Sequence, residues 1–230
     1  MKGRLNQMCN YESGTALCIG LEQPRQFRVV RSGKSQIEPL AAALSDAFHN
    51  EPHFKYLFPE EQTRRAVLPA FFRAITCASH HFGEIYTAEN VDGGALWIRP
   101  AQTFSFERIF RTVTLPPAFQ LGWTNLRRCI RFGARMDAVH KRLVTGPHWY
   151  LMALGVQPSS AAKAIAGALL QPLLSRADSD GLPCYLETFR ERDLPFYKDC
   201  GFRVEGAGSI PQGGPNFWAM VRGRRGGRGV

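Results

Sequence analysis

The sequence predicts an α/β fold built around a mixed β-sheet, and three features of the chain support this prediction. Two β-prone segments, Ile85–Glu89 and Ala95–Ile98, flank a turn over Asn90–Gly94 that contains Asp-Gly-Gly, which is typical of an antiparallel hairpin. Further along, a strand over His148–Val156 is followed by a helical segment and then by another strand. A short antiparallel pair is expected to close the sheet near the C-terminus.

The first half of the chain is predicted to contain one strand and one amphipathic helix ahead of the next break. Phe27–Arg31 has the composition of a short strand. Gln36–His49 is predicted to be helical because Leu40, Leu44 and Phe48 recur at spacings of four and therefore share one face.

A second helix is predicted over Thr63–His80, after a break at Asn50–Pro52. Pro69 falls near its first turns and is expected to kink it, because proline cannot donate the helical hydrogen bond. Beyond the hairpin, Phe104–Val144 is predicted to be mostly helical, with an interruption at Pro116-Pro117. This long insert is expected to cover the substrate side of the sheet.

The second half contains the strand at His148–Val156 and a helix over Ala161–Ala177. The apolar residues of that helix continue without a polar break, which predicts that it is buried. The remaining predicted elements are a strand at Pro183–Thr188, a short helix at Leu194–Cys200 ending at Gly201, and an antiparallel pair formed by Phe202–Glu205 and Phe217–Arg222.

The length of 230 residues is that of one domain. Residues 1–26 lack hydrophobic periodicity and are expected to form a poorly structured N-terminal extension, followed by a folded domain over residues 27–222. Residues 223–230 form a basic Gly/Arg tail that cannot contribute to a hydrophobic core.

The net charge of +10 favours an anionic partner, although many arginines lie along helical segments, where solvated faces are the usual explanation. The six cysteines include no C-x-x-C pair, so neither a metal site nor a disulfide framework is predicted. No apolar run reaches the ~18–20 residues of a membrane span, and no signal peptide is expected. A cytoplasmic protein is therefore expected, with no membrane partner and no prediction of oligomeric state.

The stretch Val156–Leu170 is the most informative part of the chain. A strand that stops at Val-x-Pro and leads into a helix presents several free backbone N–H groups at one point. Together with the helix dipole, these groups form a binding site for a phosphate or pyrophosphate.

This stretch resembles the acetyl-CoA pyrophosphate loop of the GNAT acetyltransferases. Other segments resemble the puromycin N-acetyltransferase-like branch of that superfamily: Tyr185–Val204, which contains L-E-T and P-F-Y-K-D-C-G-F, His148–Pro158, Gly94–Pro100 and Pro211–Met220. The resemblance runs from about Phe27 to Arg222. It implies a GNAT-like acyl-CoA N-acyltransferase fold, acetyl-CoA as co-substrate, and transfer of an acetyl group to an amine of a small molecule.

The resemblance also implies roles for individual residues. Tyr197 corresponds to the tyrosine that protonates the CoA thiolate, although it could instead be a packing residue. Glu187, in L-E-T, is a candidate base for the substrate amine or else a structural carboxylate. Glu51 and His53 could line the substrate side or lie in an exposed loop. The implied cofactor-binding residues are Leu154, Val156, Ala161, Ala162, Lys163, Ala164, Ile165, Ala166 and Asp193.

The loop departs from the family pattern at Ala161, where Gln or Arg is usual, and at Ala164, where Gly is usual. A methyl group at either position is expected to hold a phosphate farther from the backbone, so acetyl-CoA affinity is expected to be reduced while the fold is retained. Two alternatives to an active enzyme therefore stay open. One is a relative with an impaired cofactor site, through drift or substitution, that acts as a binding or regulatory protein. The other, less favoured, is nucleic-acid binding through the tail.

Overall fold

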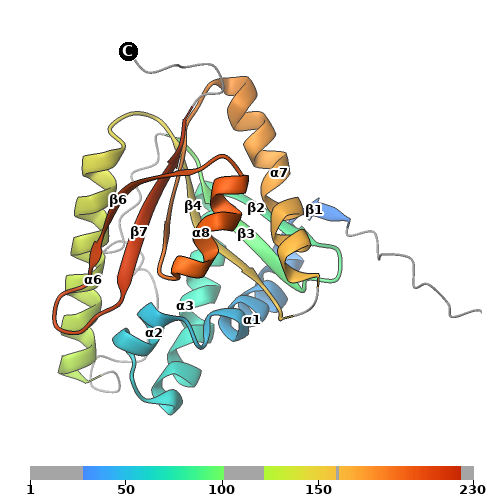
Figure 1. Cartoon of the computed structure of the whole chain (residues 1–230). Coiled ribbons are helices and arrows are strands. Elements are labelled where there is room, and N and C mark those ends of the chain that lie inside the picture. Colours follow the sequence, from blue (N-terminus) through green and yellow to red (C-terminus); the bar gives the residue numbers. More distant parts are fainter. Residues whose placement is uncertain (1–27, 101–121, 159–160, 224–230) are drawn as a thin grey trace, which may run out of the picture.

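The central sheet combines antiparallel and parallel strands. The computed structural model describes residues 28–100, 122–158 and 161–223, which contain seven strands in the order β1-β2-β3-β4-β5-β7-β6 (Figure 1). All neighbouring strands are antiparallel except β4 and β5, which are parallel. The predicted mixed α/β sheet is therefore confirmed. The strands are β1 (Val29–Arg31), β2 (Gly83–Ala88), β3 (Gly93–Ile98), β4 (Trp149–Val156), β5 (Cys184–Thr188), β6 (Arg203–Ser209) and β7 (Asn216–Arg222).

Helices α1 (Ile37–Phe48), α3 (Glu61–Phe82) and α6 (Trp123–Leu143) share one hydrophobic core with one face of the sheet. Each has an apolar stripe at helical spacing. In α6, for example, the buried residues include Phe132 and Met136. The short helix α2 (Pro52–Leu57) lies beside α1 and contributes to the same core (Figure 1).

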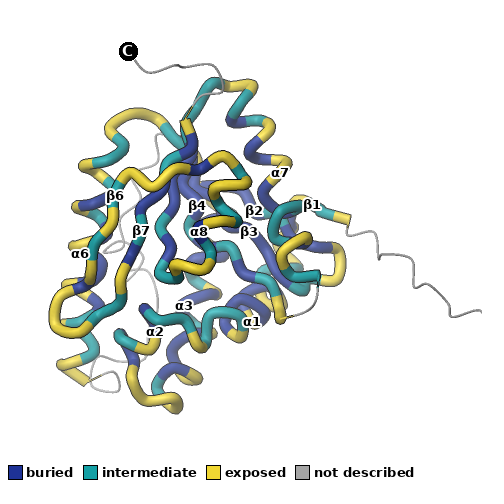
Figure 2. Tube along the Cα trace, viewed as in Figure 1, coloured by how far each residue is buried: buried dark blue, intermediate teal, exposed yellow. Residues whose placement is uncertain are grey.

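Helices α7 (Ala162–Asp180) and α8 (Leu194–Asp199) cover the opposite face. The predicted burial of α7 holds for one side of the helix only, the side that packs on the sheet, as the alternating burial along α7 in Figure 2 shows. Its continuous apolar appearance arises from alanines on the outer side, and an exposed methyl group costs little free energy.

Three further predictions are corrected by the structure. Pro69 does not disturb α3, because it lies on the exposed side of the helix, where water can replace the missing hydrogen bond. The break at residues 50–52 leads into helix α2, which begins with Pro52 in its first turn. Gly93 and Gly94 belong to β3 and not to the turn. A Cβ on Gly93 would lie 2.5 Å from the Gly155 carbonyl oxygen, so glycine allows β3 to approach β4 closely.

Several predictions concern residues outside the described ranges: the N-terminal extension over residues 1–26, the helical expectation for residues 104–121, and most of the basic tail. The short helix predicted to end at Gly201 is confirmed as α8, and Gly201 has the positive φ of +89° that favours glycine at this position. Among the described helices, none is both long and apolar enough to span a membrane.

Candidate active site

The parallel strands β4 and β5 separate partway along their length. They pair only through Trp149–Leu151 and Cys184–Leu186. The separation coincides with an irregularity on the other edge of β4. The consecutive β3 residues Leu96 and Trp97 pair with Ala153 and Leu151, which leaves Met152 between them without a partner on β3. Such a bulge bends a strand and increases its local twist, which turns the second half of β4 away from β5.

A cavity of about 430 Å³ lies at this separation, a volume suited to a small ligand or to part of a larger one. Its walls come from both strands, from α1, α2 and α3, from α6, and from the beginnings of α7 and α8. The free edge of β4 beyond Leu151 pairs with no strand among the described residues on the β5 side, so its backbone groups are available to a ligand.

Glu187 lies on the cavity wall at the point where the strands separate. Its carboxylate accepts a hydrogen bond of 2.9 Å from the Tyr150 hydroxyl and another of 2.9 Å from the Tyr185 hydroxyl. Burial raises the pKa of Glu187 to about 7, an effect that the two tyrosine hydrogen bonds partly offset and that the nearby charge of Asp137 reinforces. A carboxylate with this pKa can take up and release a proton near neutral pH.

Tyr150 and Tyr185 hold the Glu187 carboxylate in place. They are paired in register on β4 and β5, and both are buried. Burial, followed by the charge of Glu187, raises the pKa of each phenol far above its ordinary value. Both tyrosines therefore remain hydrogen-bond donors at neutral pH. The His140 ring stacks on Tyr185 with the ring centres 4.3 Å apart, and this contact fixes the phenol from the α6 side.

Tyr197 reaches the same cavity from α8. Its ring packs against Phe196 and Phe202, with centroid distances of 5.1 and 6.1 Å. Burial first, and then the charges of Asp193 and Glu51, raise the pKa of its hydroxyl. The phenol consequently stays protonated at neutral pH and is able to act as a proton donor.

An ion pair joins the far sides of the cavity. Arg190, just after β5, contacts Glu51, just before α2, with 2.5 Å between Nη2 and Oε1. Burial raises the pKa of Glu51 to about 7 even though Arg190 opposes this shift. Asp193 also lines the cavity, and burial raises the pKa of its carboxyl as well. Glu51 is therefore part of the cavity lining and not a residue of an exposed loop.

The first turn of α7 forms another part of the wall. Ala161 is the residue before the helix, and the Ile165 N–H donates to its carbonyl oxygen at 3.0 Å. The three amides between them precede the first helical hydrogen bond and have no acceptor within the helix. Lys163, at the cavity edge, lies 4.0 Å from Asp199 on α8. This arrangement gives α7 an N-terminus suited to a phosphate group.

The expected cofactor residues fall into two groups. Six of them line the cavity: Leu154, Val156, Ala162, Lys163, Ala166 and Asp193. Three do not. Ala161 packs partly on the core, Ala164 is exposed, and Ile165 is buried beneath α7. Because the Ile165 amide is already hydrogen-bonded and its side chain faces the core, Ile165 is left out of the proposed cofactor site.

Sequence reasoning missed several residues of the cavity. Sequence patterns assign no role to Tyr150, Tyr185 or Arg190. The matched positions of the two tyrosines become visible only once the β4–β5 register is known. The aromatic wall was also missed, because its rings come from segments far apart in sequence: Phe48, Phe54, Phe132 and Phe189.

The chain is similar to proteins named as acetyltransferases, although no protein-family model matches it. A Schizosaccharomyces pombe protein named as an uncharacterized N-acetyltransferase is 26% identical over 171 residues, which are 70% of this chain and 68% of that protein. A solved structure described as histone acetyltransferase HPA2 and related acetyltransferase, from Corynebacterium glutamicum, matches with a TM-score of 0.61 and 24% identity, over 88% of this chain and 98% of that one. Drosophila melanogaster polyamine N-acetyltransferase matches with a TM-score of 0.59 and 14% identity, over 86% and 99% of the two chains. These structural similarities agree with the strand order and with the separation of β4 from β5. The chain therefore has the fold of the GNAT acetyltransferases.

Proposed function

We propose that this protein is an N-acetyltransferase that transfers the acetyl group of acetyl-CoA to the amine of a small molecule. One observation carries the proposal: Glu187, Tyr197 and the first turn of α7 all line a single cavity where β4 and β5 separate. An acyl transfer to an amine needs a base, an acid and a site that holds the acyl donor, and these three features supply them.

The residues fit a CoA thioester. The free edge of β4, with Leu154 and Val156, offers backbone groups to an extended amide-containing arm, and the α7 N-terminus with Lys163 offers donors and charge to a pyrophosphate. The amine nitrogen would then attack the thioester carbon and form the new C–N bond as the C–S bond breaks. Glu187 would accept the proton that the amine loses, and Tyr197 would donate its proton to the departing thiolate.

The motifs in Tyr185–Val204 and Pro211–Met220 support the puromycin N-acetyltransferase-like branch within this proposal, without implying puromycin as the acceptor. The direct test is to incubate the protein with acetyl-CoA and a panel of primary amines, and to measure both the free CoA thiol and the mass of the acetylated amine. Product formed only in the presence of the protein supports the proposal. Acetyl-CoA binding without product from any amine contradicts it and favours a binding protein.

A binding protein is the second candidate, because the two alanines at Ala161 and Ala164 make the helix start a poorer phosphate site. Ala161 makes no side-chain hydrogen bond to the helix, and Ala164 exposes a methyl group in its first turn. Replacing them by the residues usual in the family adds a hydrogen-bonding side chain and removes the methyl group.

The double variant Ala161→Gln with Ala164→Gly is expected to bind acetyl-CoA about tenfold more tightly than the unaltered protein, as measured by calorimetric titration. Ala168→Gly is the matched control, since it weakens α7 by the same loss of helix propensity but lies outside the first turn. Equal micromolar affinity in the unaltered protein and the double variant would show that the alanines do not impair the site.

A further inference from the structure

Two histidines lie behind the tyrosine pair that holds Glu187. His140 is in the last turn of α6, and His148 directly precedes β4. Their Nε2 atoms are 2.6 Å apart, and the Nδ1 atom of His148 is 2.6 Å from the Gly146 carbonyl oxygen. A carbonyl oxygen only accepts, so the hydrogen in the second contact belongs to His148 Nδ1. When both rings are neutral, His148 Nε2 is therefore the acceptor and His140 Nε2 the donor, which fixes the orientation of both rings.

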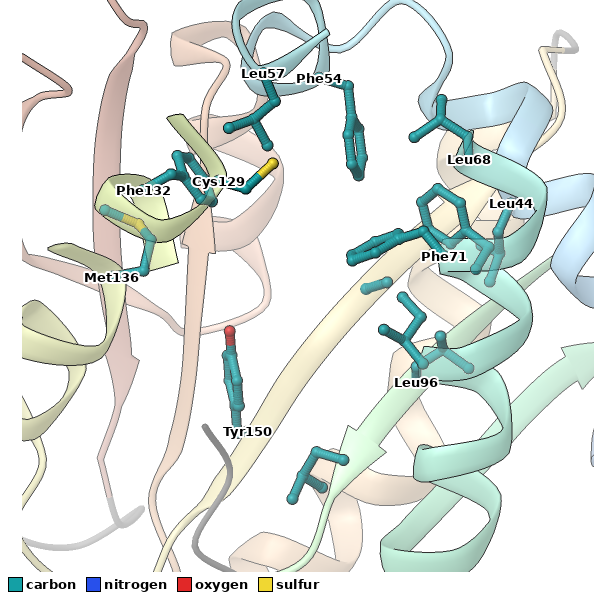
Figure 3. Packing of buried hydrophobic residues seen from close by; sticks show 14 of the residues in the cluster. Leu44, Phe54, Leu57, Leu68, Phe71, Leu96, Cys129, Phe132, Met136 and Tyr150 are labelled. Carbon is teal, nitrogen blue, oxygen red and sulfur yellow. The ribbon is translucent and has the colours of Figure 1, made fainter. Parts of the chain in front are cut away.

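The His140 ring lies against the aromatic rings of both tyrosines. It is parallel to Tyr185, with 3° between the ring planes and 4.3 Å between the ring centres. It meets the Tyr150 ring at a centroid distance of 4.8 Å and an angle of 49°. Figure 3 shows the Tyr150 hydroxyl pointing into the space beside Met136 of α6. Both phenols are thus held from the α6 side by an aromatic ring, while their hydroxyl groups donate to Glu187.

His140 is neutral at the pH at which Glu187 titrates. Burial, followed by the charges of His148 and Lys141, lowers the pKa of His140 to about 4. Asp137, one turn earlier on α6, carries a negative charge that raises the pKa of Glu187. The His140 ring therefore acts on the tyrosines near neutral pH by contact, and not through a change of its own charge.

We infer that His140 is a positioning residue for Glu187: its ring keeps the Tyr185 hydroxyl in the place where it donates to the carboxylate. This inference rests on the proposed function, in which Glu187 is the base. Burial raises the pKa of Glu187 to about 7, and the bond from Tyr185 opposes this rise more than the bond from Tyr150 does. Because a hydrogen bond to a carboxylate favours its ionised form, loosening of Tyr185 should raise the pKa of Glu187 further and move the onset of base catalysis to higher pH.

The inference is tested by titrating the Glu187 carboxyl with ¹³C NMR in protein labelled at the glutamate carboxyl carbons, the signal being assigned by its loss in Glu187→Gln. His140→Leu fills a similar volume without an aromatic face. We expect it to raise the midpoint of the Glu187 titration by about 0.5 to 1 pH unit, because Tyr185 loses its support. His140→Phe restores a ring against Tyr185 and should return the midpoint to within about 0.2 unit of the unaltered protein. His81→Leu, the same change at an exposed position of α3, should leave the midpoint unchanged.

A double variant shows whether His140 acts through Tyr185. Tyr185→Phe removes the hydroxyl and should itself raise the midpoint by about 1 unit. In that background, His140→Leu should add less than half of the shift that it causes alone, because the contact it disturbs no longer reaches the carboxylate. A shift as large as in the single variant would mean that His140 acts on Glu187 by another route, and would overturn the positioning role.

His148→Ala keeps the test informative if His140→Leu does not fold, as judged by its melting temperature. Without His148, the Nε2 atom of His140 loses its partner, and the imidazole is expected to turn toward water and away from Tyr185. The midpoint should then rise by at least about 0.3 unit. An unchanged midpoint in a folded His148→Ala protein would overturn the inference.

The titration separates this inference from the proposed function, because it reports the ionisation of Glu187 whether or not the protein acetylates an amine. A raised midpoint in His140→Leu, together with no product from any amine, would support the positioning role and count against the acetyltransferase. Product formation with an unchanged midpoint would do the reverse. In an active protein, the rising limb of kcat/KM with pH should move by the same amount as the midpoint.

Discussion

Glu187→Gln is expected to lower kcat/KM for amine acetylation by about 100- to 1,000-fold, the contribution typical of a general base. Glutamine has nearly the same shape as glutamate and keeps an oxygen that can accept a hydrogen bond from Tyr150 or Tyr185, so the local structure is expected to persist. Initial rates of CoA release, measured with one primary amine at a fixed acetyl-CoA concentration, provide the comparison.

The matched control for this variant is Glu205→Gln, which makes the same chemical change at an exposed position of β6. It should leave kcat/KM unchanged. An effect of less than threefold in Glu187→Gln, with an unchanged melting temperature, would show that Glu187 is a structural carboxylate held by two tyrosines and that the proton leaves by another route.

Tyr197→Phe is expected to lower kcat about 100-fold with little change in KM for the amine. The substitution removes only the hydroxyl and retains the ring contacts with Phe196 and Phe202. A thiolate that leaves without a proton donor raises the barrier of the step in which the C–S bond breaks, whereas binding of the amine does not depend on that proton. Steady-state kinetics with varied amine concentration separate kcat from KM.

Tyr86→Phe is the control for Tyr197→Phe. Tyr86 lies on β2 and donates a hydrogen bond of 3.0 Å to Glu84, outside the cavity, so its loss should not affect kcat. If kcat of Tyr197→Phe equals that of the unaltered protein, Tyr197 is a packing residue of α8, and the thiolate obtains its proton from solvent.

The sequence patterns predicted the elements of the fold well, because burial of one face imposes the same spacing whatever the tertiary partners are. Leu40 and Leu44 of α1 are fully buried, as their spacing of four indicated. Predictions failed where a single residue type has two uses. Gly93 was interpreted as a turn residue, but it allows two backbones to approach each other, and Pro52 was interpreted as a break although it begins a helix.

The candidate site was predictable only where its residues belong to contiguous motifs. Glu187 and Tyr197 lie in one such segment, and the structure places both on one cavity. The tyrosine pair that holds Glu187 depends on the register between β4 and β5, which local sequence does not encode. His53 and Arg190 meet in the cavity from segments more than a hundred positions apart, so no spacing rule could have associated them.

The pH dependence of kcat/KM for acetylation of one primary amine by the unaltered protein tests most directly whether Glu187 acts as the base at the separation of β4 and β5. With a pKa of about 7, the Glu187 carboxylate should produce a limb that rises with pH and levels off above pH 7 to 8, because only its ionised form accepts the proton. Glu51 has a similar pKa, so Glu51→Gln should keep this limb and Glu187→Gln should lose it. A profile that instead rises only toward the pKa of the amine itself, about 10, or that stays unchanged in Glu187→Gln, would contradict the proposed chemistry.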